Sequence, residues 1–323
     1  MNYMQEKIQL FSPGSLGTCW YGKYHYLEPW AGCAHACPYC YARSRAAVNN
    51  TLAGLGATFD RPAPLMEERR LLEEIAREAS SGRISILKLC RYTDIFSPGF
   101  VENGLALKIL DILSSSKINR IIITSKGLPD RKLIDLISAR KEKFSYNAAA
   151  RPSAALKGSP LAAFDAHLKP LDDRLRAAAE LCAAGVQTTI HLDPFVAGID
   201  DSGEALGAML GRLKELGLNR VMFSYLLFSG GIMAPMAEAI GKPALDRILA
   251  DYDLSGTHKV LPGQEDTASQ SLKNDVIKAS VEKTAAELDR LGFDFVLCSL
   301  KSVRGLDVRK YKRNMICDGK FYA

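Results

Sequence analysis

The chain carries the stretch WAGCAHACPYCYAR at residues 30–43, in which Cys33, Cys37 and Cys40 stand in C-x3-C-x2-C spacing. Three thiolates at this spacing can bind three irons of one [4Fe-4S] cubane, whereas an electron-transfer cluster normally has four cysteine ligands. The fourth iron is then open to the amino and carboxylate groups of a methionine-derived ligand. The stretch therefore predicts a [4Fe-4S] cluster bound by Cys33, Cys37 and Cys40.

Zinc is the competing interpretation of the same cysteines. Zinc prefers four tetrahedral nitrogen or sulfur ligands, and His35 could be the fourth only if it folded back inside its own loop. Tyr39, directly before the last cysteine, is either an aromatic contact for a bound adenine or a simple packing residue.

The other five cysteines are isolated, at positions 19, 90, 182, 298 and 317. Eight cysteines spread so unevenly over 323 residues do not indicate a disulfide scaffold. The hydrophobic content of 47% and charged content of 24% are ordinary for a soluble globular protein. No apolar run approaches the roughly 18 residues of a membrane span, and residues 1–11 lack a signal-peptide pattern. We therefore expect a cytoplasmic protein without a membrane partner.

The formal net charge of +6 is concentrated in residues 301–323. This segment has two acidic residues, Asp307 and Asp318, and seven basic ones: Lys301, Arg304, Arg309, Lys310, Lys312, Arg313 and Lys320. Seven minus two gives +5, so the rest of the chain is nearly neutral. Such a tail could contact phosphates or an acidic partner, or it could be a solvated tail that aids solubility.

Short β-branched or aromatic runs alternate with helical patterns, which is typical of βαβ units. The expected strands are residues 84–90, 120–125, 144–148, 187–192, 220–228 and 293–300. The expected helices are residues 65–80, 104–115, 129–141, 172–184, 204–216 and 269–291, with a long loop over 254–268. A closed barrel needs eight such units. The pattern therefore predicts an α/β fold, a partial (β/α)6-type TIM barrel over residues 1–300, with a cluster loop at 30–43 and a basic C-terminal tail at 301–323.

The motif G-C-x-H-x-C-x-Y-C-Y-A-R at Gly32–Arg43 resembles the radical S-adenosylmethionine (SAM) superfamily, and within it the spore photoproduct lyase-like group. The resemblance extends in order through about Tyr24 to Leu300. Four further segments carry it, each at an expected strand end or helix start: Cys90–Asp94, Thr124–Lys126, Phe144–Asn147 and Pro170–Arg174 followed by Ala184–Val186.

The resemblance implies that SAM binds across the strand tips. The implied SAM-binding residues are Tyr39, Thr93, Lys126, Ser145 and Asn147. All but Tyr39 fall at the C-terminal ends of expected parallel strands, where barrel active sites assemble. Lys126 would supply a cation for the SAM carboxylate. Strand-end capping is the alternative role of Thr93 and Ser145.

A cysteine at the end of the second strand returns a hydrogen atom in the lyase, and Cys90 is one position too early to match it. A one-residue slip turns a side chain to the other face of a strand. Cys298 and Cys317 are therefore further candidate hydrogen donors, and a buried structural thiol is the alternative for all three. Two residues on one expected strand face, His191 and Asp193, are candidates for substrate binding, and Phe228–Gly231 is expected to be a flexible turn.

The resemblance implies an enzyme that cleaves SAM reductively to a 5′-deoxyadenosyl radical and abstracts a substrate hydrogen, for C–C cleavage, epimerisation or rearrangement. We expect a small-molecule or nucleotide-like substrate and an external reductant such as flavodoxin or ferredoxin. A DNA repair lyase of the photoproduct type, guided by the basic tail, is one alternative, although nucleic acid is not favoured. A non-enzymatic iron–sulfur or zinc-binding protein is the other.

Overall fold

The computed structural model describes residues 6–14, 24–259, 268–298, 315–317 and 321. Eight strands form its central sheet: β1 Phe11–Pro13, β2 His25–Leu27, β5 Ile86–Leu89, β6 Arg120–Ser125, β7 Phe144–Ala150, β8 Gln187–Phe195, β9 Arg220–Tyr225 and β12 Asp294–Leu297. Their order across the sheet is β1-β2-β5-β6-β7-β8-β9-β12. All neighbours are parallel except β1, which runs antiparallel to β2.

The sheet is an open barrel, as the sequence predicts. Its outermost strands, β1 and β12, do not pair with each other within the described part of the chain. All six expected strands are present, with β9 ending earlier than expected, at Tyr225. The first parallel strand, β2, has only three residues and was not among the expected strands.

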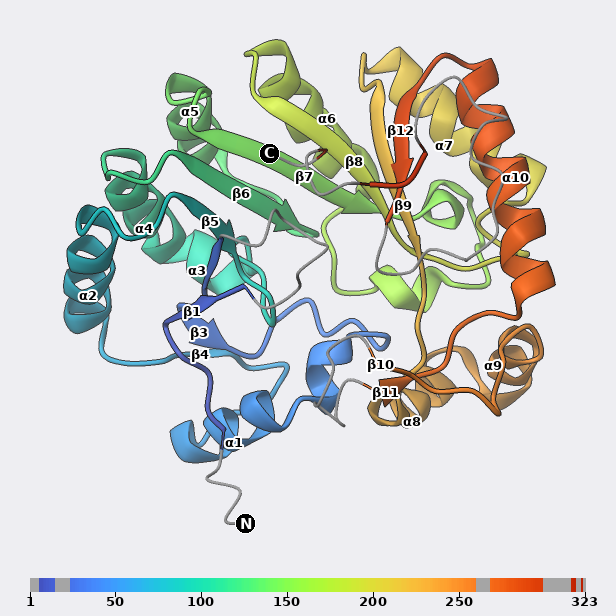
Figure 1. Ribbon diagram of the computed structural model, residues 1–323, viewed down its shortest axis with the longest axis horizontal. Helices are drawn as coiled ribbons and strands as arrows, with labels where there is room; N and C mark the ends of the chain where they lie inside the picture. Colours follow the sequence, from blue (N-terminus) through green and yellow to red (C-terminus); the bar gives the residue numbers. More distant parts are fainter. Residues whose placement is uncertain (1–5, 15–23, 260–267, 299–314, 318–320, 322–323) are drawn as a thin grey trace.

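Helices cover one face of the sheet (Figure 1). They are α2 Glu68–Ser80, α4 Leu105–Ser114, α5 Arg131–Ala139, α6 Leu171–Ala183, α7 Gly203–Glu215 and α10 Asn274–Arg290. In α2 the apolar stripe Leu71, Ile75 and Ala79 is buried, as its helical spacing predicts. These helices and the sheet side chains that point toward them form one large apolar core.

Side chains on the opposite, inner face of the sheet form a second, smaller cluster. Its buried members are Tyr24, Tyr26, Ile122, Met222, Val296, Cys298 and Cys317. Because side chains alternate across a strand, Ile121 and Ile123 pack toward the helices while Ile122 lies on the inner face. The inner face is the face on which a partial barrel can build a site.

The C-terminal segment Met315–Cys317 extends the sheet beyond β12. Ile316 forms a parallel bridge with Leu297, and the backbone nitrogen of Cys317 donates to the Leu297 carbonyl at 2.9 Å. Phe321 lies further along, where its carbonyl accepts from Arg220 at 2.6 Å. The seven basic residues of the predicted tail lie outside the described residues.

Several elements differ from the expectation and lie at the lower end of the sheet in Figure 1. They are helices α1 Ala46–Leu55, α8 Gly230–Ile240 and α9 Lys242–Leu249, and the short pair β10 His258–Lys259 and β11 Ala268–Ser269. Helix α3 Pro98–Glu102 and the pair β3 Trp30–Ala31 and β4 Ala63–Pro64 were also not expected. The expected turn at Phe228–Gly231 is therefore wrong in its second half, where α8 begins. In the described residues no helix has the length and apolarity needed to cross a membrane.

Helix α8 packs against Tyr41–Ser44, the 3-10 helix η2 that ends the cluster loop. The hydroxyls of Ser44 and Ser229 are 2.9 Å apart. A Cβ on Gly231 would lie 2.3 Å from the Ser44 hydroxyl oxygen, so only glycine permits this close approach.

We expect Gly231→Ala to lower the free energy of unfolding by about 1–3 kcal/mol, because the added methyl overpacks the α8–η2 contact. Urea unfolding of the purified chain measures it. Gly230→Ala is the matched control, since a Cβ there meets nothing within 4 Å. Equal stability of the two variants would contradict the packing assigned to α8.

Candidate functional site

The cluster loop, residues 30–43, begins with β3 and turns sharply at Gly32, directly before its first cysteine. Gly32 has a φ of +83°, and a Cβ at this position would lie 2.6 Å from the Phe59 carbonyl oxygen. The same carbonyl accepts the backbone N–H of Cys33 at 2.7 Å, and Cys40 donates to the Cys37 carbonyl at 3.2 Å. Cys33 and Cys37 are buried and Cys40 is half-buried. One tight loop therefore holds all three predicted iron ligands.

Arg43 fixes the shape of this loop. Its guanidinium donates to the carbonyls of Ala36 at 2.9 Å and Cys37 at 3.2 Å. It also forms an ion pair with Asp60 at 2.6 Å and lies 4.4 Å from the centre of the Phe59 ring. Sequence reasoning did not assign Arg43 a role, although it is the last residue of the motif.

The three thiols influence one another. Burial raises the pKa of Cys33 well above its ordinary value, and the charges of Asp94, Cys37 and Cys40 add to the effect. Burial raises the pKa of Cys37 to about 11 despite the opposing charge of Lys126. Binding of iron would therefore release protons from these thiols. In the described part of the chain, no three His, Cys, Asp or Glu side chains surround a point that could hold a single metal ion.

The buried carboxylate of Asp94 connects the ends of β5 and β6. It accepts hydrogen bonds from the Ser125 hydroxyl at 2.6 Å and the Lys126 backbone N–H at 2.8 Å. Nε2 of His35 lies 3.3 Å from the same carboxylate. Burial alone would raise the pKa of Asp94, but the His35 charge and these donors lower it to about 2.

His35 is thus turned toward Asp94. Thr93, a predicted SAM contact, donates its hydroxyl proton to the Gly32 carbonyl, which ties the end of β5 to the cluster loop.

Lys126, the predicted carboxylate partner, follows β6 and lies beside the cluster loop. It is half-buried, and its Nζ is 5.6 Å from the centre of the Tyr39 ring. Burial alone would lower the pKa of Lys126, but Asp193, Cys37 and Cys40 raise it above its ordinary value. The Tyr39 ring is buried and lies 4.9 Å from that of Phe164.

A row of polar side chains crosses three neighbouring strands on the inner face. Thr124, Asn147 and Thr189 are register partners on β6, β7 and β8. The Asn147 amide donates to the Ile123 carbonyl at 3.0 Å, but its Oδ1 has no hydrogen-bond partner among the described residues. The hydroxyls of Thr124, Thr189 and Ser145 are likewise buried without a described partner. Ser145 and Asn147 are the second and fourth residues of β7, which runs to Ala150, so the expectation that they lie at its C-terminal end is wrong. Buried polar atoms normally have partners, so this row is suited to a polar ligand or ordered water. The sequence did not indicate a ligand-binding role for Thr189, because a threonine within a strand such as β8 is common.

His191 and Asp193 share the inner face of β8, as the sequence predicts. Ser224 on β9 joins them: its hydroxyl donates to Asp193 and lies 3.2 Å from Nε2 of His191. The charge of Asp193 also raises the pKa of Lys126, the lysine beside the three-cysteine loop.

Cys298 follows β12 directly. Its backbone nitrogen donates to the Phe223 carbonyl at 3.0 Å, which continues the β9–β12 register and places Cys298 beside Ser224. It is buried in the inner-face cluster together with Cys317.

Cys90 has a different environment. It has a φ of +65°, is buried, and belongs to the same large core cluster as Cys37 and Tyr39. Burial and the charges of Glu28, Asp94 and Cys33 raise its pKa. The carboxylate of Glu28 accepts the backbone N–H groups of Arg91 and Tyr92 directly after it. Cys90 therefore lies beside the cluster loop, apart from Cys298 and Cys317.

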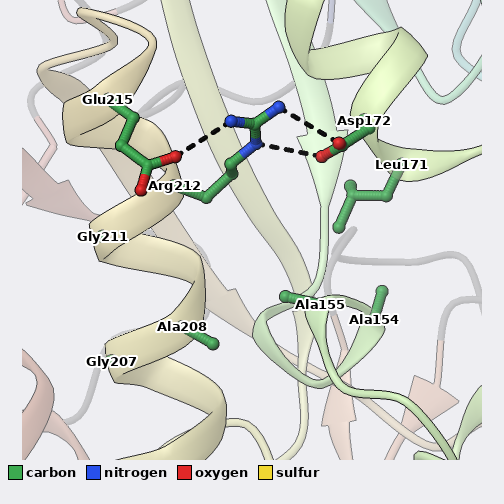
Figure 2. A pocket seen from close by; sticks show the side chains of 9 residues that line it. All are labelled: Ala154, Ala155, Leu171, Asp172, Gly207, Ala208, Gly211, Arg212 and Glu215. Carbon is green, nitrogen blue, oxygen red and sulfur yellow. Dashed lines mark hydrogen bonds and ion pairs between the residues drawn. The ribbon is translucent and has the colours of Figure 1, made fainter.

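An open hollow of about 640 Å³ lies on the helix side of the sheet (Figure 2). It is lined by Ala154, Ala155, Leu171, Asp172, Gly207, Ala208, Gly211, Arg212 and Glu215. Arg212 bridges the carboxylates of Asp172 and Glu215 across it. None of the predicted site residues lines this hollow.

The solved structures that this chain resembles include three of spore photoproduct lyase: one complexed with dinucleoside spore photoproduct, one a tyrosine-to-phenylalanine mutant and one a cysteine-to-alanine mutant. Their TM-scores are 0.61, 0.59 and 0.60. Each is 13% identical to this chain in sequence. Each match covers 88% of this chain and 78% of the lyase chain. No protein-family model and no curated protein sequence matches the chain. The similarity shows the mostly parallel α/β fold that spore photoproduct lyase has.

Glu28 makes the stability of this region depend on pH. Burial raises the pKa of Glu28 to about 8, because its effect is larger than the lowering caused by the hydrogen bond from the Arg91 backbone. The folded state therefore holds this proton more tightly than the unfolded state. The resulting stability is full at low pH and is lost as the pH rises toward 8, by about 1.4 kcal/mol per pH unit.

We expect Glu28→Gln to flatten the fall in the free energy of unfolding between pH 5 and about 8. Urea unfolding at each pH measures it, with Glu102→Gln on the exposed surface of α3 as the control. A Glu28→Gln slope equal to that of the unmodified chain would show that Glu28 does not cause the fall.

Proposed function

We propose that this chain is a radical SAM enzyme in which Cys33, Cys37 and Cys40 hold a [4Fe-4S] cluster. The observation that carries the proposal is the position of Lys126. The fold brings this cation from the end of β6 to the three-cysteine loop, where its Nζ lies 5.6 Å from the centre of the Tyr39 ring and its charge opposes the rise in the pKa of Cys37. An ammonium group beside a cluster with an open iron is what a zwitterionic ligand needs.

The residues around Lys126 can each contact a different group of SAM. Lys126 would hold the carboxylate, and Tyr39 would contact the adenine. Asn147 Oδ1 lacks a described partner and can bond to a polar group of the ligand, whereas Ser145 pairs with Ile122 near the start of β7, further from Lys126. The Thr93 hydroxyl donates its proton to the Gly32 carbonyl, so toward SAM it can act only as a hydrogen-bond acceptor. When bound, the cluster supplies the electron that cleaves SAM to a 5′-deoxyadenosyl radical.

Among the three candidate hydrogen donors we favour Cys298. It lies on the inner face beside Ser224, whose hydroxyl donates to Asp193, whereas Cys90 belongs to the large core cluster and not to the inner-face cluster. In this step the S–H bond of Cys298 breaks and a C–H bond forms on the substrate radical. The sulfur radical left behind takes an electron from the external reductant and a proton from solvent. That reductant is a small electron carrier such as flavodoxin or ferredoxin.

The substrate is a small or nucleotide-like molecule whose polar groups meet His191, Asp193 and Ser224. The outcome is C–C cleavage, epimerisation or rearrangement. Deuterium transfer from a labelled candidate into 5′-deoxyadenosine identifies the substrate.

We expect the chain, reconstituted anaerobically with iron, sulfide, SAM and dithionite, to form 5′-deoxyadenosine.

Lys126→Met should raise the KM for SAM about ten- to hundredfold, because a charged hydrogen bond contributes about 1.5–3 kcal/mol. It should leave the iron content unchanged, whereas Cys37→Ala should lower it. Lys132→Met, on the exposed face of α5, is the control. Full activity in the Cys37→Ala variant would refute the cluster assignment, and a zinc or electron-transfer protein would form no 5′-deoxyadenosine.

A DNA repair lyase is the second candidate, because three solved structures that the chain resembles are spore photoproduct lyases and one of them is complexed with a dinucleoside spore photoproduct. It predicts DNA binding that weakens steeply with salt. Alanine at Arg309, Lys310 and Lys312 should then weaken binding at least tenfold. These substitutions are preferable to deleting residues 301–323, because Met315–Cys317 belongs to the sheet. Absence of detectable binding at low salt would exclude this candidate.

A further inference from the structure

The C-terminal segment returns to the sheet in a defined register. The backbone nitrogen of Leu297 donates to the Met315 carbonyl at 2.6 Å, and that of Cys317 donates to the Leu297 carbonyl at 2.9 Å. These two bonds enclose the parallel bridge between Leu297 and Ile316. One residue further along both segments, Cys298 and Cys317 stand side by side.

The two cysteines also point to the same face. Leu297 and Ile316 pack toward the helices, while Cys298 and Cys317 both belong to the inner-face cluster. Neighbouring strands lie about 4.7–4.9 Å apart. This spacing lies within the Cα–Cα separation of about 4.4–6.8 Å that a disulfide spans.

We propose that Cys298 and Cys317 form a reversible dithiol–disulfide pair that fastens the C-terminal segment to β12. The oxidant is a small disulfide. Its S–S bond breaks as one cysteine thiolate attacks, and the second cysteine then displaces the remaining half. The products are one protein disulfide and two small thiols, so two protein thiols are oxidised and one small disulfide is reduced.

The pair would regulate the site described above, and this consequence rests on the proposed function. In the dithiol form Cys298 keeps the hydrogen that it can give to a substrate radical. In the disulfide form that hydrogen is absent. The pairing itself needs neither the cluster nor SAM.

Tryptic peptides test the pairing directly, because residues 291–301 and 314–320 each contain one cysteine. The full-length chain is equilibrated anaerobically with glutathione buffers from fully reduced to fully oxidised, then alkylated, digested and analysed by mass spectrometry. We expect the 291–301/314–320 linked peptide to exceed every other cysteine pair at least tenfold. Its fraction should fall as reduced glutathione increases.

Cys182→Ser is the matched control, because Cys182 is half-buried on α6, and it should leave the linked peptide unchanged. Cys317→Ser should remove it and leave Cys298 alkylated or bound to glutathione. The proposal is wrong if both cysteines remain thiols in the most oxidising buffer, or if either pairs equally with Cys90 or Cys182. Since this readout does not depend on SAM, a chain that forms the disulfide without forming 5′-deoxyadenosine would contradict only the proposed function.

Discussion

One buried carboxylate, that of Asp94, holds the candidate site together. Its oxygens accept bonds from the backbone of Phe96 and Lys126 and from the Ser125 hydroxyl, and His35 of the cluster loop lies against it. The ends of two strands and the cysteine loop therefore share one anchor. A buried charge is costly unless it is fully bonded, so these segments can hardly shift separately. The position of Lys126 relative to the thiols follows from this anchor.

The two faces of the sheet have different roles: one stabilises the fold and the other forms the candidate site. The face toward the helices is a continuous apolar core, which supplies most of the burial that stabilises the fold. The inner face has only a small apolar cluster and is otherwise lined by hydroxyl, amide, imidazole and carboxylate groups. Strand alternation puts both patterns into the same strands. The apolar face can thus be maintained while the inner face is adapted to a ligand.

Much of this arrangement could be predicted from the sequence, because the strands and most helices have strong local patterns. The shared face of His191 and Asp193 also follows from strand alternation alone. Helix α8 could not be predicted, since Gly230, Gly231 and Pro235 indicate a turn locally. Its glycine-rich start packs closely against Ser44, directly after the cluster loop, which is a contact between distant segments. The roles of Arg43, Glu28 and Asp94 depend on contacts between distant segments, which no local pattern encodes.

The bridge between Leu297 and Ile316 bears on how the edge of the sheet is protected. The strand β12 has β9 on one side, and on the other its backbone hydrogen bonds are supplied by Met315–Cys317. Without that segment, β12 would have open hydrogen-bonding groups that can pair with another molecule. The segment therefore protects the chain against association through this edge, and a variant that lacked it would have an uncovered strand.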